Sequence, residues 1–297
     1  MIDPRQHAEK SNPRILRCGS IRMDLESRTH VMGILNVTPD SFFDGGRYAN
    51  LRDAVEHGLR MAEEGADLID VGGESTRPGA RAVDVEEEKR RVVPVIRELC
   101  KRSTVPVSID TRKAAVAGAA LDAGACMIND VSGFRHDDEM ADVAGKAGVP
   151  VVLMHARGNP RNMQENTAYD DLIDEISASL RESIRMALEA GVPRENILID
   201  PGIGFGKAKP DNFIILDRLE SFRSLGYPLL LGVSRKSFLG WALDAPEEER
   251  LIGTAAAVTA CVLKGADFVR VHDVREMVQA VRIADCIRRG PRTQNEG

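Results

Sequence analysis

Polar side chains follow a series of short apolar runs in this sequence, each at the point where a run ends. They include acids, amides, hydroxyls and cationic groups, at Asn36, Asp44, Thr76, Arg77, Asp110, Asn129, His155, Asp200, Lys236, Ser237, Arg270 and His272. Carboxylates and amides can pair with the N–H edge of a flat heterocycle. Arginine can bind a phosphate and stack on a ring face at the same time. These residue types favour a site for a small planar molecule that carries phosphate.

The signatures of the common hydrolytic and nucleotide-binding centres are absent. The sequence contains no H-E-x-x-H, C-x-x-C or G-x-S-x-G, so zinc hydrolysis and serine nucleophile chemistry have no local support. The Gly-rich stretch 202–207 follows an apolar run, but it matches neither the G-x-G-x-x-G fingerprint nor a Walker A loop.

Taken singly, several of these residues have an ordinary structural explanation. An aspartate after a strand usually caps the next helix, so Asp110 and Asp273 could each serve only that purpose. His155 could be a hydrogen-bonded loop histidine, and Met154 could simply pack. Stability alone does not explain why cationic and acidic groups follow so many of the runs, and this gathering is what indicates a functional site.

Composition and charge exclude some classes of protein. The 297 residues include 40 Lys and Arg against 46 Asp and Glu, which gives a formal net charge of −6. That balance argues against a nucleic-acid-binding protein, which is normally basic. Five scattered cysteines without metal-ligand spacing predict reduced thiols and a cytoplasmic location. No apolar run reaches the ~18 residues of a membrane span, and residues 1–14 lack the apolar core of a signal peptide.

Eight segments are expected to form strands. Six of them follow a glycine that would end the preceding helix, and their apolar runs are continuous, as in strands buried on both faces of a parallel sheet. These six lie at 65–73, 124–130, 148–155, 191–200, 226–234 and 265–273, and the other two end at Asn36 and Asp110.

Helical patterns lie between these strands. Apolar residues recur at helical spacing over 172–188 and over 251–262, the second preceded by a helix-start signal at 244–249. A helix is also expected over 84–100, with a kink or a late start because it contains Pro94. The alternation predicts a single (β/α)8 barrel, favoured over a doubly wound sheet. We expect a flexible N-terminus at 1–13, the barrel at 14–290 with residues 14–30 as a hairpin closing its bottom, and a tail at 291–297.

Eight sequence motifs carry a family resemblance. They lie at 31–46, 70–80, 108–111, 128–130, 153–155, 199–207, 234–237 and 270–273, and they include VMGILNVTPDSFFDGG, DVGGESTRPGA, SRKS and RVHD. In content and order they resemble the bacterial dihydropteroate synthases. The resemblance implies a (β/α)8 barrel and a folate-synthesis reaction. That reaction joins 6-hydroxymethyl-7,8-dihydropterin diphosphate to p-aminobenzoate, giving 7,8-dihydropteroate and diphosphate. It further implies Mg²⁺, a homodimer and inhibition by sulfonamides.

The resemblance also implies roles for individual residues. The pterin would be bound by Asp110, Asn129, Met154, Asp200, Lys236 and Arg270. The diphosphate would be bound by Asn36, Thr76, Arg270 and His272, with Asn36 also at the metal. p-Aminobenzoate would contact Arg77, Pro78, Phe205 and Ser237. Asp44, Thr76 and Arg77 would belong to two mobile loops, and the residues closest to the chemistry would be Asp44, Arg77, Asp110, Lys236, Arg270 and His272.

An SN1-like displacement at the pterin methylene fits these residues, because a delocalised cation needs no strong base to activate the aniline. Two alternatives remain open. One is a pterin-binding barrel of the methyltetrahydrofolate–corrinoid methyltransferase type, which has no use for a diphosphate-binding set of cations. The other is an inactive paralogue that binds pterin or a partner without turnover.

Overall fold

The computed structural model describes residues 14–38, 46–77, 79–158 and 162–291. One eight-stranded parallel sheet dominates them, in the order β8-β7-β6-β5-β4-β3-β10-β9. Its strands are β3 (His30–Asn36), β4 (Leu68–Gly72), β5 (Val107–Asp110), β6 (Met127–Asp130), β7 (Val151–Met154), β8 (Ile197–Asp200), β9 (Leu230–Leu231) and β10 (Phe268–Val271). A parallel bridge between Ile199 and Leu229 joins the two ends of the sheet. The predicted closed barrel and all eight strands are confirmed.

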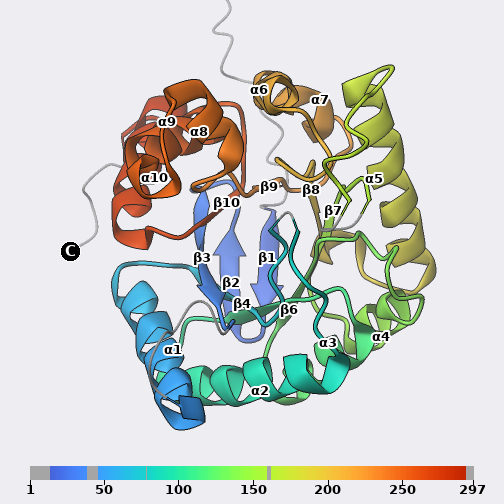
Figure 1. Cartoon of the computed structure of the whole chain (residues 1–297), viewed down its shortest axis with the longest axis vertical. Coiled ribbons are helices and arrows are strands. Elements are labelled where there is room, and N and C mark those ends of the chain that lie inside the picture. Colours follow the sequence, from blue (N-terminus) through green and yellow to red (C-terminus); the bar gives the residue numbers. More distant parts are fainter. Residues whose placement is uncertain (1–13, 39–45, 78, 159–161, 292–297) are drawn as a thin grey trace, which may run out of the picture.

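Helices surround the sheet as an outer ring (Figure 1). They are α1 (Gly46–Glu63), α2 (Val85–Arg102), α3 (Ala114–Asp122), α4 (Met140–Ala147), α5 (Leu172–Glu189), α6 (Lys209–Asp217), α7 (Leu219–Arg223), α8 (Ser237–Leu243), α9 (Leu251–Leu263) and α10 (Val274–Arg289). Short 3-10 turns lie at Arg194–Asn196 and Glu247–Glu249. Glycine ends α4 as predicted, since the C-cap Gly148 adopts a left-handed φ of 63°.

Two helix boundaries differ from expectation. The late start predicted for the helix containing Pro94 is wrong: α2 begins at Val85, and the Asp84 side chain accepts a hydrogen bond from Glu87 N at 2.9 Å. Buried residues before and after Pro94 hold the helix together across it. The helix start expected at Asp244 is also wrong, because Asp244 instead ends α8 in a left-handed conformation. The acidic run after it forms the separate 3-10 turn, and α9 begins only at Leu251.

An apolar layer fills the bottom of the barrel. Alternate residues of a strand point to opposite faces, and the inward residues of this layer are Met32, Leu68, Met127, Val152, Leu198, Leu230 and Phe268. The antiparallel hairpin of β1 (Ile15–Cys18) and β2 (Ile21–Asp24) packs Leu16 and Met23 into the same cluster. Figure 1 shows this hairpin within the ring of helices. The hairpin predicted to close the barrel is confirmed.

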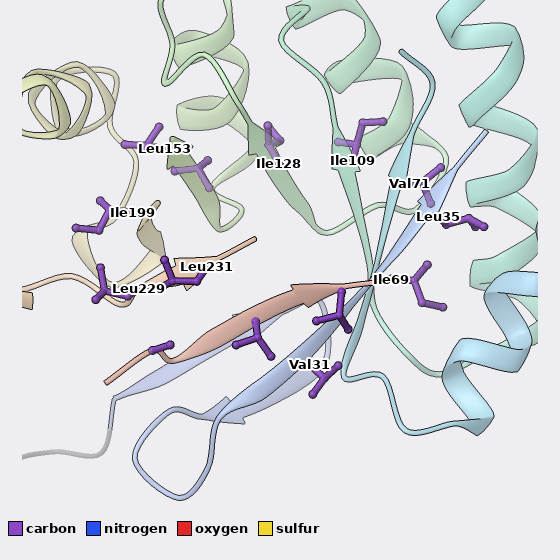
Figure 2. Packing of buried hydrophobic residues seen from close by; sticks show 14 of the residues in the cluster. Val31, Leu35, Ile69, Val71, Ile109, Ile128, Leu153, Ile199, Leu229 and Leu231 are labelled. Carbon is purple, nitrogen blue, oxygen red and sulfur yellow. The ribbon is translucent and has the colours of Figure 1, made fainter. Parts of the chain in front are cut away.

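A larger apolar core lies between the strands and the surrounding helices. Figure 2 shows part of it, with Val31, Val71, Ile128 and Leu153 among the labelled side chains on the strands. Within the described residues, no helix is both long and apolar enough to cross a membrane. The expected N-terminal segment 1–13 lies outside the described residues, as does all of the expected tail 291–297 except residue 291.

Candidate active site

A polar layer follows the apolar one inside the barrel. Two positions further along the strands, the inward residues are Asp70, Asn129, Met154, Asp200 and Arg270, and Asp110 occupies the equivalent place on β5. All of these side chains except Arg270 are less than a tenth exposed. Because the strands are parallel and in register, their carboxyl-end residues converge on one space. The predicted site residues of the strands are therefore brought together.

Arg270 is held by two buried carboxylates. Its Nε donates to Asp70 Oδ2 at 2.6 Å, and its Nη2 donates to Asp110 Oδ2 at 2.6 Å. Asn129 Nδ2 donates to the same Asp70 oxygen at 2.8 Å. Four strands thus contribute to one charged network, and hydrogen bonds from two of its nitrogen atoms fix the plane of the Arg270 guanidinium.

Sequence reasoning missed Asp70. It lies in the middle of β4 and not at its end, so a search of strand ends passes over it. The signal was available, because Asp70 lies two positions before Gly72 and therefore shares an inward face with the last residue of its strand. A fully buried aspartate inside an apolar strand also needs a partner.

Burial shapes the protonation of the acids. It raises the pKa of Asp110 to about 7, with the neighbouring Asp70 adding to the effect and Arg270 opposing it. It also raises the pKa of Asp200, against the opposing charge of Lys236 and a hydrogen bond from Gly202 N to Asp200 Oδ1 at 2.7 Å. Both carboxylates are thus costly to keep charged without a cationic or N–H-donating partner.

Lys236 reaches across from the loop after β9 to the loop after β8. Its Nζ donates to the carbonyl of Ile203 and lies 4.6 Å from the ring centroid of Phe205. Burial lowers the pKa of Lys236 to about 8, whereas the charge of Asp200 acts in the opposite direction. Lys236 and Phe205, predicted for two different substrates, therefore form one wall of the site.

Lys207, the last residue of the Gly-rich stretch 202–207, is a further residue that sequence reasoning missed. It is 1% exposed, and its Nζ lies 2.8 Å from His155 Nδ1 and 2.9 Å from the Phe205 carbonyl. Burial lowers the pKa of Lys207 well below its usual value and that of His155 to about 2. The contact between Lys207 and His155 therefore links the Gly-rich stretch to the end of β7. The backbones of Gly202 and His155 also lie close together. Only glycine fits at position 202, because a Cβ there would lie 1.9 Å from the His155 carbonyl oxygen.

His272 is oriented by a serine from the neighbouring strand's loop. Ser234 Oγ accepts from His272 N at 3.2 Å and lies 3.0 Å from His272 Nδ1. Burial and, in the same direction, the charge of Arg270 together lower the pKa of His272 to about 4. The ring is thus neutral near pH 7. Which of the Ser234 hydroxyl and His272 Nδ1 donates depends on the tautomer of the ring.

The Ser234–Ser237 loop is braced from two sides. Arg235, with a left-handed φ of 56°, donates to both oxygens of Asp273 at 2.9 and 2.5 Å. Asp273 is therefore an ion-pair partner and does not cap α10 with its side chain. Asp110 does not cap a helix either, because the N-cap of α3 is Lys113. Ser237 accepts a hydrogen bond from Lys209 Nζ at 2.6 Å.

The loop after β4 brings two predicted residues to the rim. Thr76 and Asp110 border the same small cavity, of about 10 Å³. Arg77 extends outward, and its Nη2 lies 2.7 Å from Glu247 Oε1 in an exposed ion pair. In this structure Arg77 thus pairs with the turn before α9 and not with the polar layer. Asp44 and Pro78 lie outside the described residues.

Asn36 lies at the end of β3, on the inward face next to the loop after β4. Its Oδ1 and Asp110 Oδ2 lie 3.8 and 3.6 Å from the point where a Cβ on Gly72 would be. Among the described residues, no group of three or more His, Cys, Asp or Glu could hold a metal ion. The amide oxygen of Asn36 suits a magnesium ion that arrives with phosphate, because such an ion takes oxygen ligands and needs only one or two of them from the protein.

Known proteins match both the sequence and this fold. A family model described as pterin binding enzyme matches residues 32–272. The dihydropteroate synthase of Clostridium beijerinckii is 50% identical over 273 residues, which cover 92% of this chain and 99% of the relative. Xanthomonas albilineans dihydropteroate synthase, solved with 4-aminobenzoic acid, superposes with a TM-score of 0.88 at 45% identity, covering 94% and 100% of the two chains. Yersinia pestis dihydropteroate synthase, solved with a sulfonamide drug, superposes with a TM-score of 0.87 at 44% identity, and the match covers 92% of this chain and 99% of the relative. The chain belongs to the dihydropteroate synthase family of pterin-binding enzymes.

Proposed function

We propose that this chain joins 6-hydroxymethyl-7,8-dihydropterin diphosphate to p-aminobenzoate, releasing diphosphate. The observation that carries the proposal is the buried polar layer in which Arg270 is fixed between Asp70 and Asp110. A diphosphate-bearing heterocycle needs both a cation at its charged end and acids at its ring edge. The layer offers both in one space, and family membership supports the assignment.

Acids and an amide recognise the pterin edge. Asp200 pairs with the 2-amino group and N3–H, Asn129 and Asp110 complete the edge, and Lys236 donates to the carbonyl and a ring nitrogen. Burial of Asp200 strengthens this pairing, because hydrogen bonds to a carboxylate gain strength where water is excluded. Met154, 3% exposed at the end of β7, packs beneath the ring.

Cationic and neutral donors at the rim hold the diphosphate. Arg270 packs on the pterin and contacts the diphosphate together with the His272 ring, and Asn36 and Thr76 approach it from the other side. Asn36 would also bind Mg²⁺, since its amide oxygen is of the ligand type that this ion accepts. When bound, the ion neutralises charge on the departing diphosphate.

The displacement at the pterin methylene is SN1-like. As diphosphate leaves, positive charge spreads over the ring, and the carboxylates of Asp110 and Asp200 stabilise it electrostatically. The neutral aniline nitrogen of p-aminobenzoate then attacks the cation. No nucleophile–base pair is needed, and the buried residues around the ring exclude the water that would compete with the aniline.

p-Aminobenzoate binds where Phe205 and Ser237 form fixed walls. Arg77 and Pro78 from the loop after β4, with Asp44 from the loop after β3, close the pocket over it. Sulfonamides occupy the same place, a proposal supported by the sulfonamide complex of the Yersinia pestis relative.

The proposal also covers the extent of the catalytic unit, the oligomeric state and the cellular location. We expect residues 14–290 to act as one catalytic unit and two chains to form a homodimer. The exposed apolar side chains of Ile252 on α9 and of Ile283 and Ile287 on α10 support a covered surface there. A cytoplasmic location fits the free thiols of all five cysteines.

One assay tests the proposal against its alternatives. Purified protein with Mg²⁺ and both substrates should release diphosphate only when p-aminobenzoate is present, and 7,8-dihydropteroate should accumulate in equal amount. A corrinoid methyltransferase would instead demethylate methyltetrahydrofolate, and an inactive paralogue would bind pterin without releasing diphosphate. Either result would refute the proposed activity.

A further inference from the structure

Two cysteines far apart in the sequence meet at the bottom of the barrel. Cys18 ends β1 of the hairpin, and Cys126 immediately precedes β6. Cys18 belongs to the apolar cluster at the bottom of the barrel, and Cys126 packs against the same cluster. The backbone is close as well, because a Cβ on Gly19, the residue after Cys18, would lie 3.7 Å from the Cβ of Cys126. The two cysteines are therefore neighbours.

The environments of the two thiols differ. Cys18 is 1% exposed within the apolar cluster of the barrel bottom, whereas Cys126 is partly exposed at its edge. Cys126 also lines a cavity of about 360 Å³, together with Arg17, Pro150 and Asn196. This cavity lies at the opposite end of the barrel from the polar layer. A small polar reagent can thus reach Cys126 from solvent, with Cys18 directly behind it.

The contact also favours ionisation of the accessible thiol. The interaction between the two side chains lowers the pKa of Cys126 and raises that of Cys18. The Cys126 thiol itself donates to the Val107 carbonyl at 3.5 Å. Thiolate character and access together determine which cysteines react with oxidants.

We propose that Cys126 and Cys18 form a reversible disulfide when a hydroperoxide enters the cavity at the bottom of the barrel. The Cys126 thiolate attacks one peroxide oxygen, the O–O bond breaks, and a sulfenic acid and water (or an alcohol) result. The Cys18 sulfur then attacks the sulfenic sulfur and expels a second water. Two thiols are oxidised by two electrons and one peroxide is reduced. Cys126 is the reacting thiol and Cys18 the resolving thiol.

The disulfide would link the hairpin covalently to β6. It closes a loop of roughly a hundred residues, so it restricts the unfolded chain and stabilises the folded one. The link lies below the apolar layer, and the polar layer at the other end of the barrel keeps its contacts. The oxidised protein should therefore resist heat better while retaining its activity.

Thiol mapping of the full chain tests the proposal. Reduced protein is treated with one equivalent of hydrogen peroxide, and the remaining thiols are then capped with maleimide and located by peptide mass spectrometry. We expect three of the five cysteines to be capped and one linked peptide pair, containing Cys18 and Cys126. Dithiothreitol should restore all five reactive thiols, and the oxidised form should melt several degrees higher.

Two variants sharpen the test. Cys18→Ser should leave a sulfenic acid on Cys126 that dimedone labels, because the resolving thiol is gone. Cys100→Ser is the matched control, since Cys100 is an exposed thiol on α2 nearby and should not be needed for the link. Oxidation that leaves Cys18 and Cys126 capped, or that links either of them to Cys100, would overturn the proposal. Conversion of Cys126 directly to a sulfinic acid in the wild-type protein would do the same.

Discussion

Asp70 on β4 and Arg270 on β10 form a buried ion pair across the inside of the barrel, with Arg270 Nε 2.6 Å from Asp70 Oδ2. The two strands are separated by β3 in the sheet, and the two residues are 200 positions apart in the sequence. Asp70 itself is fully buried and also accepts from Asn129. It therefore orients two residues proposed to touch the pterin while remaining out of reach of any substrate. We regard Asp70 as a positioning residue, which acts through Arg270 and Asn129.

Replacing Asp70 should damage both stability and the site. Asp70→Ala leaves the Arg270 charge with one partner fewer in a buried setting, and loss of one member of such a pair costs about 3–5 kcal/mol. Denaturant unfolding at pH 7 measures this loss. Asp217→Ala is the control, because Asp217 forms an exposed pair with Lys264 whose loss should cost at most about 1 kcal/mol. Equal effects of the two substitutions would refute the positioning role.

Asp200 is expected to provide most of the specific pterin affinity. Asp200→Ala removes a bidentate partner and leaves the substrate's buried N–H donors unpaired, at ~2–4 kcal/mol. Asp200→Asn should be nearly as harmful, because its NH₂ would face another donor. Titration calorimetry with a pterin ligand measures both. A pterin affinity of Asp200→Ala within about threefold of wild type would correspond to a loss of binding free energy well under ~1.4 kcal/mol. Asp200 would then not belong to the pterin site.

His272 should make the folded protein more sensitive to acid. Burial and Arg270 lower its pKa from 6.5 to about 4, so between these values the unfolded chain binds a proton that the folded chain does not. Stability from this group is therefore complete above about pH 6.5 and is lost as the pH falls toward 4. Unfolding free energies should fall more steeply over this range in wild type than in His272→Gln. Parallel curves for the two proteins would contradict a neutral, buried His272.

Much of this architecture could be predicted because the relevant signals are local. Glycines that end helices, and continuous apolar runs that end in polar residues, specify the strands and the end of the barrel at which Asp110, Asn129 and Asp200 gather. Asp70 was missed because it precedes its strand end by two residues. The contact between Lys207 and His155 depends on how the Gly-rich loop folds back, which no spacing reveals. Asp244 carried a genuine helix-start signal, but tertiary packing ends α8 there instead.

Arg77 should affect turnover more than pterin affinity. In the structure it pairs with Glu247 in an exposed ion pair, which is worth at most about 1 kcal/mol and is easily exchanged for another partner. If the loop after β4 closes late, Arg77→Ala lowers kcat by about tenfold or more while the Kd of pterin diphosphate changes little. Arg81→Ala is the control, because Arg81 is an exposed arginine further along the same loop. Equal losses in kcat and in pterin affinity for Arg77→Ala would argue against late closure.

Ligands of the p-aminobenzoate pocket should bind weakly until diphosphate is present. p-Aminobenzoate has one charge and few atoms. Among its proposed partners that the structure describes, Phe205 and Ser237 are already held in place, by contacts with Lys236 and Lys209. Arg77 is paired with Glu247 and must leave it for the pocket to close. A ligand of a rarely populated closed state loses affinity in proportion to that population.

Mg²⁺ and diphosphate should therefore tighten sulfonamide binding by at least about tenfold, a coupling of ~1.4 kcal/mol or more. Because such coupling is reciprocal, the sulfonamide must tighten diphosphate binding by the same factor. Calorimetric titrations of the sulfonamide with and without Mg²⁺ and diphosphate measure the first factor, and the reverse titration measures the second. Glu247→Gln releases Arg77 from its exposed partner, so it should raise sulfonamide affinity in the absence of diphosphate. An identical sulfonamide Kd with and without Mg²⁺ and diphosphate would refute the closing-loop mechanism, while the pterin-site assignments would stand on their own tests.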